Sequence, residues 1–121
     1  MANPNILTAT SVVGGRYSTG PLSSTIANLL TNGVSGHVYR VLGIRITNYD
    51  NSNSQSVSLA VGTGSVSLGA GKTFLHQKVL TGATSLQVLD DPIYLLEGES
   101  IAGNTASGGF VNILITYEDI S

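Results

Sequence analysis

Hydrophobic and polar residues alternate along most of this chain in runs of strand length. The alternation is clearest over residues 56–61 and 111–117. Successive side chains of a strand point to opposite faces, so a period of two predicts strands with one buried face. Turn-forming pairs such as Gly14-Gly15 and Asn32-Gly33 separate the runs at intervals of roughly 8 to 12 residues.

This pattern predicts ten short strands. They span residues 6–13, 25–30, 38–49, 56–61, 65–68, 74–79, 85–89, 93–96, 100–103 and 110–117. No crossover helix separates them, so the predicted fold is an all-β, antiparallel, jelly-roll-like β-sandwich of eight to ten strands. The length of 121 residues suits a single domain over 1–121, with 1–6 as an extended N-terminal arm.

Two segments leave alternatives open. The hydrophobic phase of 38–49 changes at Gly43, which indicates either a bulge at that glycine or burial of both faces of the strand. In 23–31, Ile26, Leu29 and Leu30 have helical spacing, so a short helical turn is the alternative to a strand there.

Charged residues make up only 10% of the chain, against roughly 25% in an ordinary soluble domain. Much of the surface must therefore consist of Ser, Thr, Asn, Gly and Ala, which suits a protein that packs against copies of itself or against a partner. The net charge is −2 and the five cations are scattered along the sequence, which argues against nucleic-acid binding. No apolar run approaches the roughly 18 residues of a membrane span.

No motif in the chain indicates catalysis, so we expect neither enzymatic activity nor a bound cofactor. Gly71-Lys72-Thr73 has the ending of a phosphate-binding loop, but Val66 stands where the first glycine is needed and a strand follows, so a hairpin turn is expected. The absence of cysteine excludes thiolate sites and disulfides. His37 and His76 are far apart, so each is expected to face solvent or an interface, where titration could make assembly sensitive to pH.

The acidic residues are expected to lie in turns or near the C-terminus, and no metal site is predicted from them. They form sequence neighbours at 90–91, 97–99 and 118–119, whereas acid–base pairs face each other across a cleft. Gly98 is expected to supply a positive φ angle in a tight reversal. The run 50–54 has alternating oxygen ligands but lacks the glycine and glutamate of a calcium loop, so a polar loop tip is expected.

Four segments carry a resemblance to a known class of proteins. They are the N-terminal Met-Ala-Asn-Pro-Asn-Ile, residues 38–50 (VYRVLGIRITNYD), residues 93–101 (IYLLEGESI) and the terminal Tyr-Glu-Asp-Ile-Ser. In order and spacing they resemble small virion structural proteins of tailed bacteriophages, especially phages of cyanobacteria. The resemblance implies a β-sandwich bound to the outside of a capsid or to a tail, often as a symmetric oligomer.

The predicted interface is the N-terminal arm Asn3, Pro4, Asn5 and Ile6, because proline keeps the chain extended and Ile6 offers an apolar anchor. A simple first edge strand is the alternative for this arm.

Together these observations favour a capsid decoration or cement protein. It would bind the major capsid protein at capsomer junctions, associate into a homotrimer, and reside on the capsid exterior after synthesis in the host cytoplasm. A tail, neck or fibre component is the first alternative. A carbohydrate-binding module is the second, although the chain lacks Trp and its tyrosines fall mostly in strands.

Overall fold

A computed structural model describes residues 11–69, 72–106 and 108–121 of the chain. These residues form nine strands and, within these ranges, no helix that could cross a membrane. The strands are β1 (Val12–Thr19), β2 (Ala27–Thr31), β3 (Val38–Asn48), β4 (Gln55–Thr63), β5 (Thr73–Leu80), β6 (Thr84–Gln87), β7 (Ile93–Leu95), β8 (Glu99–Thr105) and β9 (Val111–Ile120).

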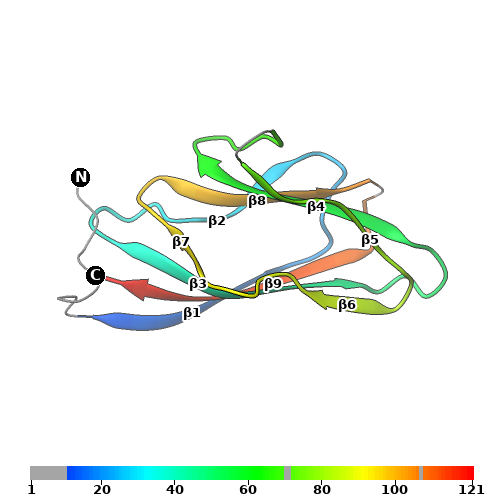
Figure 1. Ribbon diagram of the computed structural model, residues 1–121, viewed down its shortest axis with the longest axis horizontal. Coiled ribbons are helices and arrows are strands. Elements are labelled where there is room, and N and C mark those ends of the chain that lie inside the picture. Colours follow the sequence, from blue (N-terminus) through cyan, green and yellow to red (C-terminus); the bar gives the residue numbers. More distant parts are fainter. Residues whose placement is uncertain (1–10, 70–71, 107) are drawn as a thin grey trace.

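The strands form two antiparallel sheets that face each other, as Figure 1 shows. The five-stranded sheet has the order β1-β9-β3-β6, with β7 also paired to β3, and the four-stranded sheet has the order β2-β8-β4-β5. β6 and β7 lie one after the other along the same edge of β3. The prediction of an all-β antiparallel sandwich is confirmed.

The strand pairs are nested in the sequence, and they are divided between the two sheets. The first strand pairs with the last, β2 with β8, β3 with β6 and β7, and β4 with β5. This arrangement is the jelly roll, and it explains why strands distant in sequence lie side by side.

The hydrophobic core lies between the sheets and is built from alternate residues of the long strands. Its fully buried members include Val41, Ile44, Ile46, Val57, Leu59, Leu95, Ile101, Val111, Ile113 and Ile115. Full burial of each such side chain contributes about 1.5 to 3 kcal/mol relative to exposure. The hydrophobic residues that alternate in the sequence are therefore the residues that form the core.

The phase change in β3 is a β-bulge. The register against β9 shifts between Val41 and Gly43, so that Tyr39 and Val41 before the shift face the core together with Ile44 and Ile46 after it. Leu42 has the same sequence phase as the buried Ile44 and Ile46, but it is exposed at the bulge. Burial of both faces, the alternative for this strand, is limited to its start, where the adjacent residues Val38 and Tyr39 are both buried.

The first predicted strand, 6–13, overlaps the first observed strand at Val12 and Val13. Residues 6–10 lie outside the described ranges, and the strand begins at Val12 and continues through Gly14-Gly15, where a turn was expected. Gly15 pairs with Tyr117 of β9, and a Cβ atom at Gly15 would lie 2.5 Å from the ring of that tyrosine. This glycine makes room for an aromatic ring and does not reverse the chain.

One further expectation and one alternative are wrong, whereas the strand expected at 25–30 is present as β2. Residues 65–68 form no strand, because Val66 and Leu68 pack onto the outer side of the four-stranded sheet within the β4–β5 connection. Residues 23–31 contain no helical turn, because β2 hydrogen-bonds to β8 over Ala27–Thr31. In both segments, packing against a neighbouring strand determined the local structure.

Candidate interaction surface

The sequence-predicted interface, Asn3, Pro4, Asn5 and Ile6, lies outside the described residues, so it stays a prediction. Among the described residues, a different surface combines the features of a binding site. It is the outer side of the five-stranded sheet.

Arginine and tyrosine are distributed unequally between the two sheets. All three arginines, together with Tyr17, Tyr39, Tyr94 and Tyr117, lie in strands of the five-stranded sheet, and the fifth tyrosine, Tyr49, directly follows β3. The strands of the four-stranded sheet contain neither residue type. Arginine and tyrosine are enriched in the central parts of protein interfaces.

The register brings the three arginines to the same outer side of this sheet. Ile113 and Ile115 of β9 are buried, so Leu114, Thr116 and Glu118 point outward. Cross-strand partners share a face, and Arg16 is opposite Thr116, Arg45 opposite Leu114 and Arg40 opposite Glu118. We call this outer side the arginine face, defined by Arg16, Arg40, Arg45, Tyr94, Leu114, Thr116 and Glu118.

The cations are scattered along the sequence, but the fold brings the three arginines together on the arginine face. Three arginines and Glu118 give its strand residues a net charge of +2, in a chain whose net charge is −2. Arg40 Nη1 lies 3.5 Å from Glu118 Oε1, and Arg45 Nη1 donates to Ser85 Oγ at 3.4 Å. Arg16 is exposed and makes no ion pair with a described residue.

Exposed apolar side chains accompany the charges. Tyr94 of β7 is opposite Arg40 and is 45% exposed, while Leu42 at the bulge and Leu96 beyond β7 are also exposed. A face that combines arginine with tyrosine and leucine offers both charge-assisted hydrogen bonds and apolar area to a partner.

A shallow depression of about 820 Å³ lies at the end of the arginine face near Tyr49. It is lined by Ser18, Thr19, Gly20, Pro21, Arg45, Thr47, Tyr49, Asn112, Ile113 and Leu114. The Tyr49 hydroxyl donates to the Gly109 carbonyl and its ring lies 5.8 Å from that of Phe110, so the aromatic side chain is held in place while half-exposed.

The outer side of the four-stranded sheet is partly closed by the chain itself. Ala60 and Ala102 are fully buried there beneath Val66 and Leu68 of the β4–β5 connection, which Figure 1 shows above β8 and β4. The Asn28 side chain fixes this cover, since its Nδ2 donates to the Gly64 carbonyl at 2.8 Å and its Oδ1 accepts from Val66 N at 3.1 Å. The part of this face around Ala60 and Ala102 is therefore covered, whereas Val79 of β5 remains exposed on the same side.

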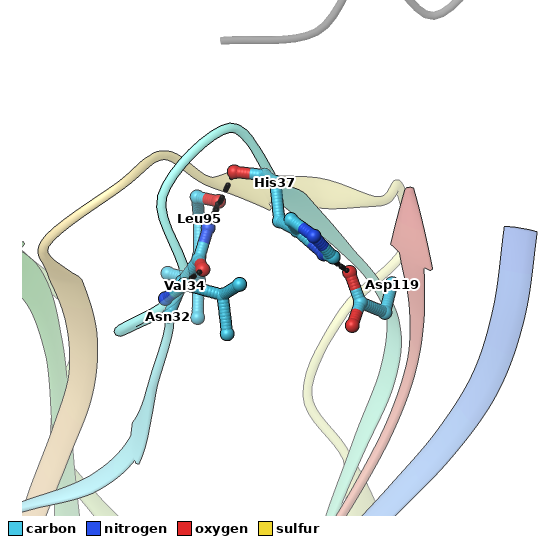
Figure 2. Close-up of polar contacts among 5 residues, drawn as sticks. All are labelled: Asn32, Val34, His37, Leu95 and Asp119. Atoms are coloured by element: carbon cyan, nitrogen blue, oxygen red, sulfur yellow. Dashed lines mark hydrogen bonds and ion pairs between the residues drawn. The ribbon is translucent and has the colours of Figure 1, made fainter. Parts of the chain in front are cut away.

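The two histidines have different surroundings. His37 Nδ1 lies 2.6 Å from Asp119 Oδ1, as Figure 2 shows, so His37 links the β2–β3 connection to β9. His76 is exposed on β5. Neither forms part of a group of three or more potential metal ligands among the described residues.

A buried asparagine holds the same end of the sandwich. Asn32 Nδ2 donates to the carbonyls of His37 and Leu95, both at 2.9 Å, and its Oδ1 accepts from Val34 N at 3.2 Å (Figure 2). Asn48 has the same role at the other end of β3, where its Nδ2 donates to the carbonyls of Asn53 and Leu80. Both connections next to β3 are therefore fixed by hydrogen bonds.

Tyr39 lies behind the arginine face, on the core side, with its ring stacked on Tyr117 at 4.8 Å. Burial raises the pKa of the Tyr39 hydroxyl, and the negative charge of Asp119 and the neighbouring Tyr117 raise it further. Tyr39 is thus held in its neutral form and acts as a core residue.

The remaining candidates from the sequence are turn residues. Gly98 has a φ of +82°, as expected for a tight reversal between β7 and β8. Asp50 accepts hydrogen bonds from Ser52 N and from the Asn53 side chain, and these hold the pKa of its carboxyl below the usual value. Lys72 precedes β5 in the turn that starts at Gly69, which agrees with an ordinary turn there.

Comparison with known proteins gives a fold likeness and no family. No protein-family model matches the chain, and no curated protein is significantly similar to it. Among solved structures, it is similar to a chain in the capsid of Ralstonia phage GP4, with 14% sequence identity and a TM-score of 0.43 over 98% of this chain and 90% of that chain. At these values the likeness assigns neither family nor function.

Sequence reasoning missed the arginine face, although a signal for part of it was present. Arg40 and Arg45 are five positions apart, so in a regular strand they would point to opposite faces. The bulge at Gly43, which the sequence did indicate, brings both to the same side. The position of Arg16 depends on the pairing of β1 with β9, which no local pattern reveals.

Proposed function

We propose that this protein is a structural component of a tailed-bacteriophage virion, specifically a capsid decoration protein that binds the outer shell at capsomer junctions and stabilises it. The sequence resemblance and the jelly-roll sandwich support this class. The observation that carries the proposal is the arginine face, an open, cationic and tyrosine-bearing sheet surface on a chain that is otherwise poor in charge.

The partner in this proposal is the major capsid protein, which would present carboxylates to the arginine face. Arg16 and Arg45 supply planar donors for bidentate contacts, and Tyr94 and Leu42 supply apolar area beside them. Each attachment is modest, but copies that associate and bind several capsomers hold far more strongly than a single contact. The homotrimer expected from shell symmetry stays a prediction.

The test is binding of the purified protein to phage particles that lack it. The double variant Arg16→Gln/Arg45→Gln should bind at least about tenfold more weakly, with a smaller dependence on salt. Lys72→Gln/Lys78→Gln removes the same charge outside the arginine face and should bind within about twofold of wild type. Equal weakening by both variants would show that only net charge matters and would contradict the proposed face.

A tail, neck or fibre component would use the same fold and the same face. Reconstruction of intact particles separates the two positions, because a decoration protein would lie on the shell in many copies. Density for this chain confined to the tail would replace the capsid proposal with the tail alternative.

A carbohydrate-binding module remains the second candidate, favoured by the depression in which Tyr49 lies beside Arg45 and Asn112. An exposed aromatic ring with neighbouring polar side chains is a common platform for a sugar. Binding on a glycan array that is lost in Tyr49→Ala but kept in Tyr94→Ala would establish this function, since Tyr94 does not line the depression.

A further inference from the structure

Three of the four sheet edges carry features that discourage pairing with another chain. The β6/β7 edge consists of strands of four and three residues with Pro92 between them. The β2 edge is five residues long and has a register shift, and β5 has two register shifts against β4, a positive φ at Gln77 and a lysine at position 78. Short strands, bulges, lysine and proline are the usual protection of open edges.

The fourth edge, β1, has none of these features. It is eight residues long and pairs with β9 without a register shift over its whole length. It contains no lysine, proline or carboxylate, and Val12 and Val13 are 56% and 58% exposed. Among the described strands, β1 has β9 as its single neighbour. A long and regular edge of this kind is a template for a further strand.

The ladder shows which backbone groups of β1 are free to pair. Ser11 and Ser121 exchange two backbone hydrogen bonds, and such pairs alternate along an antiparallel ladder. Val13, Gly15, Tyr17 and Thr19 therefore bond to β9, while the N–H and C=O groups of Val12, Gly14, Arg16 and Ser18 point away from it.

We propose that the β1 edge pairs with β1 of a second copy of this chain, antiparallel about a two-fold axis at Gly15. In this register Val12 is opposite the partner's Ser18 and Gly14 is opposite the partner's Arg16. All four outward-facing residues find partners, and four pairs that exchange two bonds each give about eight hydrogen bonds.

Side-chain complementarity favours this register over its neighbours. Gly14 has no atom within 4 Å of the position of a Cβ, so it leaves room for the opposing Arg16 side chain. On the other side of the strand Val13 meets the partner's Tyr17, a favourable β-branched and aromatic pair. Moving the axis to Arg16 would place two arginines directly opposite each other, which is unfavourable, and moving it to Gly14 would leave Ser18 without a described partner.

Pairing of this kind would make the two five-stranded sheets continuous and place their arginine faces side by side. The inference concerns the self-association within the proposed function, where it would replace the expected homotrimer with a two-fold dimer, and it does not depend on attachment to a shell. Two copies joined through β1 would present two arginine faces to one target.

The natural chain contains no cysteine, so engineered cysteines test the register directly. The single variants Val12→Cys and Ser18→Cys each change an exposed residue. In the proposed dimer, position 12 lies opposite position 18, at a Cα separation of about 5.5 Å that a disulfide can span. Identical positions lie six residues apart along the strand, about 20 Å, which no disulfide spans.

Oxidation of either variant alone should therefore give no covalent dimer, whereas an equal mixture of the two should give a cross-linked dimer on a non-reducing gel. Cross-linking of each variant alone as efficiently as the mixture would indicate random collision and would overturn the register.

The mass of the natural protein in solution gives an independent test. We expect a concentration-dependent dimer that Gly14→Pro weakens at least about tenfold, because proline removes an outward N–H from both copies without affecting the bonds to β9. Gly14→Ala keeps that N–H and should remain a dimer. A monomer at all concentrations, or a trimer without the mixed cross-link, would overturn the proposal. Because neither measurement uses particles, failure here would leave the proposed virion function standing.

Discussion

The outer faces of the two sheets differ in almost every respect that matters for binding. The four-stranded sheet presents small residues, Ala60 and Ala102, and covers them with its own β4–β5 connection. The five-stranded sheet presents arginine, tyrosine and leucine, and no described segment covers them. Part of one outer face is therefore covered by the chain itself, whereas the arginine, tyrosine and leucine side chains of the other remain exposed.

The largest expected difference between the two faces is in the free energy of unfolding when a glutamate is introduced on each of them. Ala102→Glu would bury a carboxylate beneath Val66 and should lower the free energy of unfolding by about 3 kcal/mol or more. Thr116→Glu on the arginine face should change it by less than about 0.5 kcal/mol, because the side chain remains in water beside Arg16. Urea unfolding of both variants measures the difference, and equal destabilisation would mean that the faces are not distinct.

A smaller loss of stability is expected when the hydrogen bonds that hold the β4–β5 connection over the four-stranded sheet are removed. Asn28→Ala removes both hydrogen bonds that hold the β4–β5 connection and should cost about 1 to 2 kcal/mol. The amide of Val66 should also exchange its hydrogen faster than in wild type. Asn112→Ala, on the open face, is the matched control and should leave both quantities unchanged. Normal exchange at Val66 in Asn28→Ala would show that apolar contacts alone hold the cover.

The smallest effect concerns the tyrosines behind the arginine face. The pKa of Tyr39 is raised in the folded protein, so the neutral form contributes stability that is complete below about pH 10, the pKa of an unperturbed tyrosine. That contribution is lost as the pH rises through the higher pKa of the folded state. Urea unfolding between pH 8 and 11 should show a smaller loss in Tyr39→Phe than in wild type, whereas the exposed Tyr94→Phe should follow wild type. Identical curves for all three proteins would contradict the assigned role of Tyr39.

The sequence was sufficient for most of the fold. Alternation over 56–61 and 111–117 reports burial between two sheets, and the phase change at Gly43 correctly indicated a bulge. The segment 65–68 also alternates, but its apolar residues cover the outside of a sheet, and periodicity alone does not say which surface an apolar residue meets. Gly14-Gly15 was interpreted as a turn because the ring that fills the space beside Gly15 comes from Tyr117 at the other end of the chain.

The candidate surface was less accessible to sequence reasoning, because it depends on which strands are neighbours. Arg16 and Arg45 come together only because β1 and β3 lie on either side of β9. The exposed edge of β1 is likewise recognised only by comparison with the other three edges. Local patterns predict which residues are buried, whereas a surface formed by strands that are distant in sequence can be predicted only when the pairing of those strands is known.

The pairing of β1 with β9 has a consequence for synthesis of the protein. While a ribosome is still translating the chain, β1 has emerged but β9, its neighbour among the described strands, has not. The sheet cannot close until β9 leaves the exit tunnel, and contacts between residues so distant in sequence form slowly. A polypeptide truncated before β9 would expose both β1 and β3 as open strands, so incomplete translation products of this protein should aggregate or be degraded.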